Sequence, residues 1–243
     1  MNVTAIIQAR MGSTRLPGKV LADVGGRSML ARVCTRLQRA VLVDRILVAT
    51  TQRPDDDRIV AECDRLAVAC FRGSQHDVLD RYQRAAAAYE ADVVVRITAD
   101  CPLIDPTVVD CVVGAFLHHR PDYASNTLQR TWPRGLDTEV MTAAALARAC
   151  REATESYQRI HVTPYLYHHA ESFRLLSVAG PEDRGHCRWT VDVAEDLEFV
   201  RAVYQRMGND GVFSWQQVWE VLVREPALAE RNRHVHQKQL VEG

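Results

Sequence analysis

The sequence has no Cys-x-x-Cys pair, and its seven cysteines are an odd number. Both observations argue against a disulfide framework and against a zinc ribbon, which need cysteines paired at characteristic spacings. We therefore expect free thiols in a reducing compartment, where buried cysteines behave as small apolar side chains. The seven are Cys34, Cys63, Cys70, Cys101, Cys111, Cys150 and Cys187.

The sequence also lacks an excess of charge and a long apolar run. Its 30 basic and 31 acidic residues leave a net charge of -1, so no global field favours nucleic acid or an anionic membrane. No apolar run approaches the length of a membrane span, and the opening MNVTAIIQAR shows no basic leader before a longer apolar stretch. We expect a cytoplasmic protein without nucleic-acid or membrane partners.

Two common nucleotide-binding motifs are missing as well. Five residues instead of four separate Gly12 from Gly18, and Val20 follows Lys19 where a P-loop has Ser or Thr. The Rossmann Gly-x-Gly-x-x-Gly pattern is absent too. A phosphate site in this chain therefore belongs to another class.

The first half of the sequence does contain an alternation of short apolar strands and amphipathic helices. Near-continuous apolar strands separated by helices predict a mainly parallel α/β sheet covered on both faces. Ligands bind at the carboxyl ends of such strands, so the loops after the first and fourth strands are the candidate ligand-binding loops. The expected strands are 3–8, 45–50, 68–71 and 92–97, and the expected helices are 27–40, 55–66 and 77–89.

The second half is less regular, and no repeat or linker divides it from the first. We expect a single domain over residues 1–225, followed by a polar and loosely ordered C-terminal tail at 226–243. Ser214 is a candidate cap for the last helix. The expected strands are 122–125, 136–141, 172–177 and 187–191, and the expected helices are 142–155, 194–207 and 215–224.

A loop rich in glycine and positive charge follows the first strand. Gly12 and Gly18 allow the backbone to curl so that successive N–H groups converge on an anion. Arg10, Arg15 and Lys19 add three positive charges. A triphosphate needs such an arrangement, because its charge must be neutralised before a nucleophile can approach. The expected nucleotide contacts in this loop are Ala9, Gly12, Ser13, Thr14, Arg15 and Lys19.

Two carboxylates are candidate metal ligands. Asp100 follows the fourth strand, and Asp192 lies between an expected strand and a helix. Magnesium usually takes one or two carboxylates, with phosphate and water oxygens filling its other positions. Alone, Asp192 would be interpreted as a helix cap, but the triphosphate loop favours a ligand. Asp105 is followed by Pro106, a pair typical of a helix start, so a structural role is expected for Asp105.

Several motifs carry a family resemblance. The segment IIQARMGSTRLPGKVL resembles the N-terminal signature of the cytidylyltransferases that activate acidic sugars, such as the 3-deoxy-manno-octulosonate and acylneuraminate enzymes. The segments at Asp100 and Asp192 match that superfamily in the same order. GSQHDVLDRY at 73–82, GLDTEV at 135–140 and HVTPY at 161–165 are closest to its spore-coat polysaccharide biosynthesis branch. The resemblance covers residues 3–205; one departure is Ala194, where related enzymes often place proline.

This resemblance implies a Rossmann-like nucleotide-diphospho-sugar transferase fold of the GT-A type. It also implies a homodimer, CTP as co-substrate and Mg²⁺ as cofactor. Residues 1–120 would form the nucleotide-binding half, and 121–225 the acceptor-binding and dimerisation half. Magnesium would be held by Asp100 and Asp192, and Asp80 and Arg81 would lie near the base. The catalytic set would be Arg10, Arg15, Lys19 and Asp100.

The acceptor site is predicted from weaker signals. Asp137 and Glu139 alternate in an extended segment and so share one face. His161 and Tyr165 would share a face if their segment is helical, and His161 is a candidate base. The resemblance suggests a nonulosonic or keto-deoxy sugar acid as acceptor, with a phosphonate or another small acid as the alternative.

Two other functions stay open. A nucleotide-sugar-dependent glycosyltransferase of the same fold usually carries an Asp-x-Asp motif, whereas Cys101 and Pro102 follow Asp100 here. A non-catalytic nucleotide-binding protein is disfavoured by the presence of the three loop cations and both aspartates. The sequence therefore favours magnesium-dependent transfer of CMP from CTP to an acidic acceptor.

Overall fold

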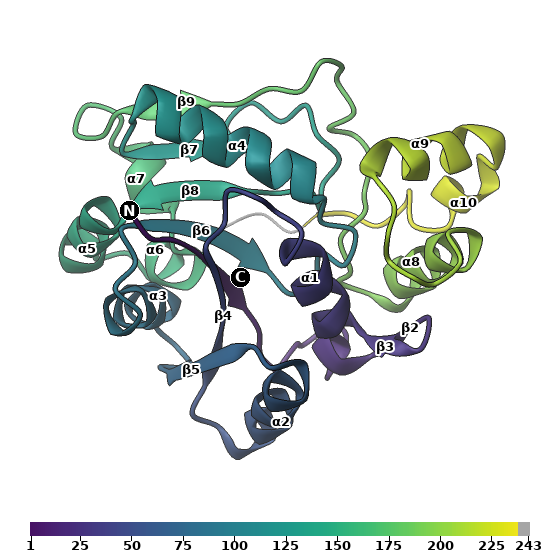
Figure 1. The fold of residues 1–243 in the computed structure, drawn as a ribbon, viewed down its shortest axis with the longest axis horizontal. Helices are drawn as coiled ribbons and strands as arrows, with labels where there is room; N and C mark the ends of the chain where they lie inside the picture. The colour runs from purple at the N-terminus through teal and green to yellow at the C-terminus, as the bar shows by residue number, and fades with distance from the viewer. Residues whose placement is uncertain (238–243) are drawn as a thin grey trace.

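The computed structural model describes residues 1–237, and its centre is a seven-stranded sheet of order β5-β4-β1-β6-β8-β7-β9 (Figure 1). Four neighbouring strands are parallel and rich in apolar residues, as expected for strands covered on both faces. The prediction of a mainly parallel α/β sheet is confirmed. These strands are β1 (Val3–Gln8), β4 (Arg45–Thr51), β5 (Ala69–Gly73) and β6 (Val93–Thr98).

The remaining strands extend the sheet beyond β6 in mixed directions. β8 (Glu139–Thr142) is antiparallel to both β6 and β7 (Tyr123–Ser125), and β9 (Leu175–Ser177) is parallel to β7. β1 and β6 are parallel neighbours, so the loops that follow them leave the sheet at the same edge. This brings together the two loops to which the sequence directed attention.

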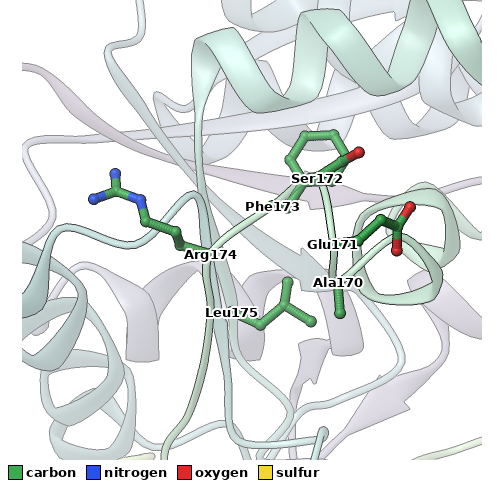
Figure 2. Close-up of a pocket in the computed structure, with 6 residues that line it drawn as sticks. All are labelled: Ala170, Glu171, Ser172, Phe173, Arg174 and Leu175. Carbon is green, nitrogen blue, oxygen red and sulfur yellow. The ribbon is translucent and has the colours of Figure 1, made fainter.

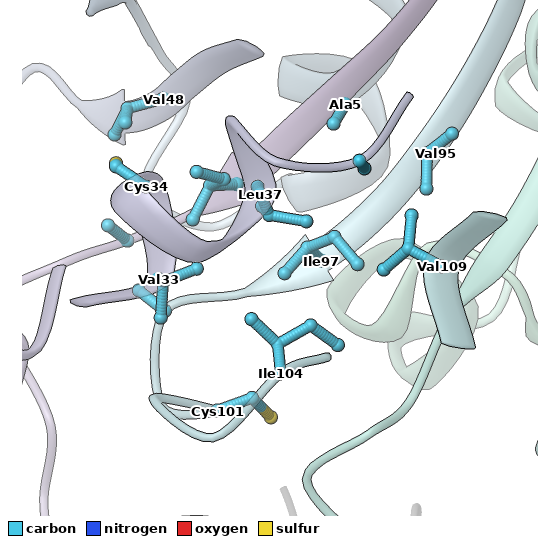
Figure 3. Packing of buried hydrophobic residues seen from close by; sticks show 14 of the residues in the cluster. Ala5, Val33, Cys34, Leu37, Val48, Val95, Ile97, Cys101, Ile104 and Val109 are labelled. Atoms are coloured by element: carbon cyan, nitrogen blue, oxygen red, sulfur yellow. The ribbon is translucent and has the colours of Figure 1, made fainter. Parts of the chain in front are cut away.

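Helices cover both faces of the sheet because successive strand residues point to opposite sides. In β1, Ala5 and Ile7 belong to one apolar cluster and Ile6 to the other. Figure 3 shows the first cluster, with Val33 of α1 and Val109 of α4 near the strands. That face carries α1 (Met29–Leu37), α2 (Asp57–Leu66) and α4 (Pro106–His119). The other carries α3 (Val78–Ala88), α5 (Ala143–Glu152), α6 (Ser156–His161) and α7 (Pro164–His168).

Three C-terminal helices pack together to one side of the sheet (Figure 1). Leu228 and Asn232 are 3% and 2% exposed, so this part of the chain belongs to the folded unit. The expectation of a loosely ordered tail from residue 226 is therefore corrected; residues 238–243 of that tail lie outside the described residues. The unit comprises α8 (Ala194–Arg206), α9 (Trp215–Arg224), α10 (Ala227–Glu230) and the hairpin of β2 (Asp23–Val24) and β3 (Arg27–Ser28).

Three strand predictions differ from the structure by three residues or more. β9 begins at Leu175 instead of 172. β8 begins at Glu139 instead of 136, because the side chain of Asn126 binds the backbone N–H of Thr138 and the carbonyl of Leu136. These hydrogen bonds replace the ladder that a longer strand would make. Residues 187–191 form no strand; a single bridge joins Arg134 to Arg188.

Several local predictions are confirmed. Asp105 caps α4, with Pro106 at its first position, and Ser214 caps α9. All seven cysteines are free thiols. None of the described helices combines the length and the apolar composition that crossing a membrane requires.

Candidate active site

The loop that follows β1, residues 9–19, is folded back on itself. The carbonyl oxygen of Met11 accepts hydrogen bonds from the N–H groups of Ser13 and Gly18, both at 2.9 Å. Gly18 has a φ of 71°, in the left-handed region that glycine adopts without strain. A short 3-10 helix, Lys19–Leu21, begins directly afterwards. The curled loop that the sequence predicted is therefore present.

Asp56 anchors the start of loop 9–19 to the neighbouring strand. Its carboxylate is buried, and one oxygen accepts from the Met11 N–H at 2.7 Å. The other oxygen accepts from the N–H and the hydroxyl of Thr51, at the end of β4. From the sequence, Asp56 was only one of the acidic residues at a helix start.

Loop 9–19 has unused hydrogen-bond donors. The N–H groups of Arg10, Gly12, Thr14 and Arg15 have no acceptor in the part of the chain that the structure describes. The side chain of Arg10 is exposed and forms no ion pair with any described residue. Free N–H groups in a curled loop, next to an unpaired guanidinium, are the donors that a phosphate chain requires.

Lys19 brings the two predicted metal carboxylates together. Its ammonium lies 2.8 Å from Asp100 Oδ2 and 2.9 Å from Asp192 Oδ1, and it donates to the carbonyl of Val191 at 2.7 Å. The other oxygen of Asp100 accepts from the hydroxyl of Thr98 at 2.6 Å. Asp100 and Asp192, which are distant in sequence, thus face one point at the end of loop 9–19.

Asp192 is held in place by a group of charged side chains. Arg15 lies 3.0 Å from its Oδ1, and Arg188 lies 3.0 Å from its Oδ2. Arg188 also binds Asp196, which is fully buried and accepts from the Asp192 N–H at 2.9 Å. Asn232 donates to the same Asp196 carboxylate at 2.9 Å. The C-terminal helical unit therefore positions one of the two carboxylates.

The charges of this group reinforce one another. Burial lowers the pKa of Lys19, but the Asp100 and Asp192 carboxylates outweigh burial and leave that pKa above its ordinary value. Burial raises the pKa of Asp192, and Lys19, Arg15 and Arg188 outweigh it, so that pKa lies below its ordinary value. Both groups are therefore charged at neutral pH.

The donor set fits magnesium. Two carboxylates within reach of one ammonium are also within reach of one small cation. Within residues 1–237 there is no group of three or more His, Cys, Asp or Glu side chains that could hold a metal by themselves. Magnesium usually keeps waters and substrate phosphate oxygens and takes only one or two carboxylates. Asp100 and Asp192 therefore fit a cation that arrives with a nucleotide.

A cavity of about 400 Å³ contains most of the predicted acceptor residues. We call it the arginine cavity, because three guanidinium groups line it. Asp137 forms a two-pronged ion pair with Arg130, at 2.6 and 2.8 Å. Glu139 pairs with Arg96 and accepts from the hydroxyl of Thr163 at 2.6 Å. The lining residues are Arg96, Thr127, Leu128, Arg130, Arg134, Asp137, Glu139, His161, Thr163 and Tyr167.

The structure does not bring Tyr165 to the arginine cavity. A shared helical face of His161 and Tyr165 required one helix through both residues, and this condition is not met, because a γ-turn separates α6 from α7. Val162 has φ 73° and ψ −55°, and the N–H of Thr163 binds the His161 carbonyl at 2.9 Å. Tyr165 instead donates to Glu152 at 2.8 Å, and Tyr167 lines the cavity. Strain of this kind on a β-branched residue concentrates at functional sites.

Comparison with known proteins places this site in a family. A sequence profile described as "Cytidylyltransferase" matches residues 4–218. The chain belongs to the cytidylyltransferase family. The family assignment agrees with the resemblance carried by loop 9–19 and by the segments at Asp100 and Asp192.

Individual relatives agree with the assignment. The spore coat polysaccharide biosynthesis protein SpsF of Bacillus subtilis is 34% identical over 235 residues, covering 94% of this chain and 97% of that protein. A 3-deoxy-manno-octulosonate cytidylyltransferase of Trichlorobacter lovleyi is 40% identical over 119 residues, 48% of this chain and 46% of that protein. A solved cytidylyltransferase structure from Leptospira borgpetersenii has a TM-score of 0.92 and 33% identity, covering 98% of this chain and 100% of that one.

The predicted base contacts of this cytidylyltransferase occupy different environments. Arg81 is fully buried and donates to the carbonyl of Ser74. Burial lowers its pKa, and the nearby Arg10 guanidinium acts in the same direction, so Arg81 lies close to loop 9–19. Asp80 lies on the outer side of α3, 4.0 Å from Arg84. Contact of either residue with the base stays a prediction.

The sequence reasoning missed the arginines of the cavity. Arg96 stands inside an otherwise apolar strand, an unusual position that the sequence displays openly. Arg130 and Arg134 precede Asp137 in the sequence, and only the fold shows that all three line one cavity. The cytidylyltransferase therefore has more positive charge around its predicted acceptor residues than the motifs alone indicated.

A second hollow, of about 550 Å³, lies at the β9 edge of the sheet and is lined by residues 170–175 (Figure 2). In that view the charged ends of Glu171 and Arg174 extend to opposite sides. None of the predicted site residues of the cytidylyltransferase lines it. The predicted site residues therefore lie away from this hollow.

Proposed function

We propose that the protein transfers CMP from CTP to an acidic acceptor, such as a nonulosonic or keto-deoxy sugar acid, and releases pyrophosphate. The observation that carries the proposal is the convergence of Lys19, Asp100 and Asp192 at the end of a loop with unused N–H donors. Family membership supports the cytidylyltransferase class. The acidic acceptor is supported by the positive lining of the arginine cavity.

In this reaction an acceptor hydroxyl oxygen attacks the α-phosphorus of CTP, and the bond to the β-phosphate oxygen breaks. The hydroxyl proton passes to solvent, and pyrophosphate leaves. The work of the chain is positioning and charge neutralisation. The N–H groups of loop 9–19, with Arg10, Arg15 and Lys19, bind the triphosphate. Asp100 and Asp192 would hold magnesium, which neutralises charge on the phosphate oxygens when it is bound.

The test is pyrophosphate release with magnesium, each of the four nucleoside triphosphates, and a panel of sugar acids and phosphonates. We expect release with CTP and a sugar acid together. Release with a phosphonate alone would change the acceptor class, and release with GTP or UTP instead of CTP would overturn the cytidine assignment. CTP binding without turnover on any acceptor would favour a non-catalytic protein.

Asp100→Asn tests the role of the metal carboxylate. We expect turnover to fall by at least about 100-fold, the range for removing a group that stabilises transition-state charge, with CTP binding retained within about tenfold. Asp64→Asn is the matched control, because Asp64 is exposed on α2 and distant in sequence from the site. Near-normal turnover of folded Asp100→Asn would refute this role.

A further inference from the structure

The three arginines of the arginine cavity do not have equivalent partners. Arg96 is paired with Glu139, and Arg130 with Asp137. Arg134 is half-buried and forms no ion pair or side-chain hydrogen bond with any residue from 1 to 237. Burial, with repulsion from Arg130 and Arg188, outweighs the attraction of Asp137 and lowers the pKa of Arg134. Partial burial of an unpaired guanidinium costs free energy unless a ligand supplies a negative charge beside it.

The charge of the cavity lining points to the ligand. Among the lining residues that the structure describes, three guanidinium groups face two carboxylates, which leaves one positive charge in excess, on Arg134. A ligand with a single negative group would neutralise it. A planar guanidinium pairs in two-pronged fashion with a planar carboxylate, which a neutral hydroxyl cannot reproduce. The lining therefore favours a monoanionic carboxylate ligand.

The lining of the cavity also offers neutral polar groups. Tyr167 lines it, and its hydroxyl has no hydrogen-bond partner among the described residues. Thr127 and Thr163 add two more hydroxyls. A volume of about 400 Å³ lies in the range of small-molecule sites. A ligand with one carboxylate and several hydroxyl groups matches both the arginines and the neutral hydroxyl groups of this lining.

The backbone places Arg134 next to the carboxylate pair. The N–H of Arg134 binds the Cys187 carbonyl at 2.9 Å, and the Trp189 N–H binds the Arg134 carbonyl at 2.6 Å. The same segment continues to Asp192, and the N–H of Val191 binds the Asp100 carbonyl at 2.8 Å. The backbone of Arg134 is thus joined to the segment that carries Asp192 and, through Val191, to Asp100.

We propose that Arg134 is the anion anchor of the arginine cavity and binds the carboxylate of the acceptor sugar acid. The inference rests on the proposed function and extends it to a residue that sets acceptor specificity. Arg130 and Arg96 shape the cavity through their own ion pairs. Arg134 discriminates acids from neutral sugars of the same shape.

The test measures equilibrium binding by calorimetry, with magnesium and α,β-methylene-CTP, which cannot react. The probes are 3-deoxy-manno-octulosonate and N-acetylneuraminate, each compared with its methyl ester, which keeps the hydroxyls and loses the charge. We expect Arg134→Met to weaken binding of the acid by roughly 10- to 100-fold, the range for a lost charge-assisted pair, and to leave the ester unchanged. Arg134→Lys should restore part of the loss, and Arg174→Met, at an exposed position, should change nothing.

Three outcomes would overturn the anchor: equal binding of the acid by Arg134→Met and wild type, equal binding of acid and ester by wild type, or no binding of either acid while the nucleotide analogue binds. Failure of the analogue to bind would instead refute the proposed function. A melting temperature for each variant shows whether it is folded. The nucleotide affinity of Arg134→Met serves as the internal control, since Arg134 does not belong to loop 9–19.

Discussion

Lys19 lies between Asp100 and Asp192, the two carboxylates that would hold a divalent cation. Its ammonium already contacts both carboxylates, and Arg15 and Arg188 neutralise Asp192 further. A metal ion that binds alone would therefore have to displace this buried ammonium. It would also add positive charge where cations already neutralise the carboxylates. A triphosphate brings its own negative charge, which can draw Lys19 and Arg15 away from the carboxylates. We therefore expect metal binding to depend on nucleotide binding.

We therefore expect Lys19→Met to bind Mn²⁺, a spectroscopic substitute for magnesium, at least about tenfold more tightly without nucleotide, because a competing charge is lost. Turnover should fall in the same variant, because a phosphate contact is lost. Electron paramagnetic resonance of free Mn²⁺ measures the affinity. Arg10→Met is the control, since it removes a cation of the same loop that contacts neither carboxylate. Unchanged or weaker Mn²⁺ binding in Lys19→Met would contradict the coupling.

At the scale of elements, a close backbone contact joins the segment that leads to Asp137 and Glu139 to the segment that leads to Asp192. Gly135 has φ 115°, and a Cβ there would lie 2.6 Å from the carbonyl carbon of Trp189. Only glycine permits both the conformation and the contact. The bridge between Arg134 and Arg188 lies beside it. The arginine cavity and the carboxylate pair therefore depend on one glycine for their relative position.

Gly135→Ala should destabilise the protein by about 2 to 4 kcal/mol, since it adds both backbone strain and a backbone clash. We expect the affinity for the acceptor to decrease more than the affinity for CTP, because Gly135 lies outside loop 9–19, the predicted triphosphate site. Urea unfolding and calorimetry measure the two effects. Gly114→Ala is the control: it lies within α4, its Cβ would make only a 3.4 Å contact, and up to about 1 kcal/mol of stabilisation is expected. Equal stability of the two variants would argue against the close contact.

At the scale of the whole molecule, α1 connects the sheet to the C-terminal helical unit. The buried guanidinium of Arg36 donates to the carbonyls of Ile104, Gly211 and Phe213, at 2.5, 2.9 and 2.9 Å. Arg32 binds the carbonyls of Val24, Gly25 and Asn209 in the same way. Because α8 begins beside Asp192, this attachment also supports the site.

Arg36→Met should lower the free energy of unfolding by about 3 to 5 kcal/mol, since it leaves buried carbonyl groups without a donor. Chemical denaturation gives the value. Arg39→Met, in an exposed position just after the same helix, should cost less than about 0.5 kcal/mol. An equal loss of unfolding free energy in both variants would show that the contacts of Arg36 do not stabilise the protein.

Local signals explain the parts of the molecule that the sequence predicted well. Apolar strands between amphipathic helices indicated the parallel half of the sheet, and Asp105-Pro106 indicated the start of α4. The apolar side chains within residues 187–191 predict a buried strand. Whether these residues form a strand depends on which backbone lies beside them to accept and donate hydrogen bonds. Periodicity cannot supply that information.

The sequence by itself determined the α/β class, the curled loop 9–19 with its cations, and the candidate carboxylates Asp100 and Asp192, because each depends on residues adjacent in the chain. Only the tertiary structure decided that Lys19 joins those carboxylates and that Arg134, in the arginine cavity, has no side-chain partner among residues 1–237. Such contacts join residues far apart in sequence. Their geometry depends on how the sheet, the γ-turn at Val162 and the C-terminal helices pack together.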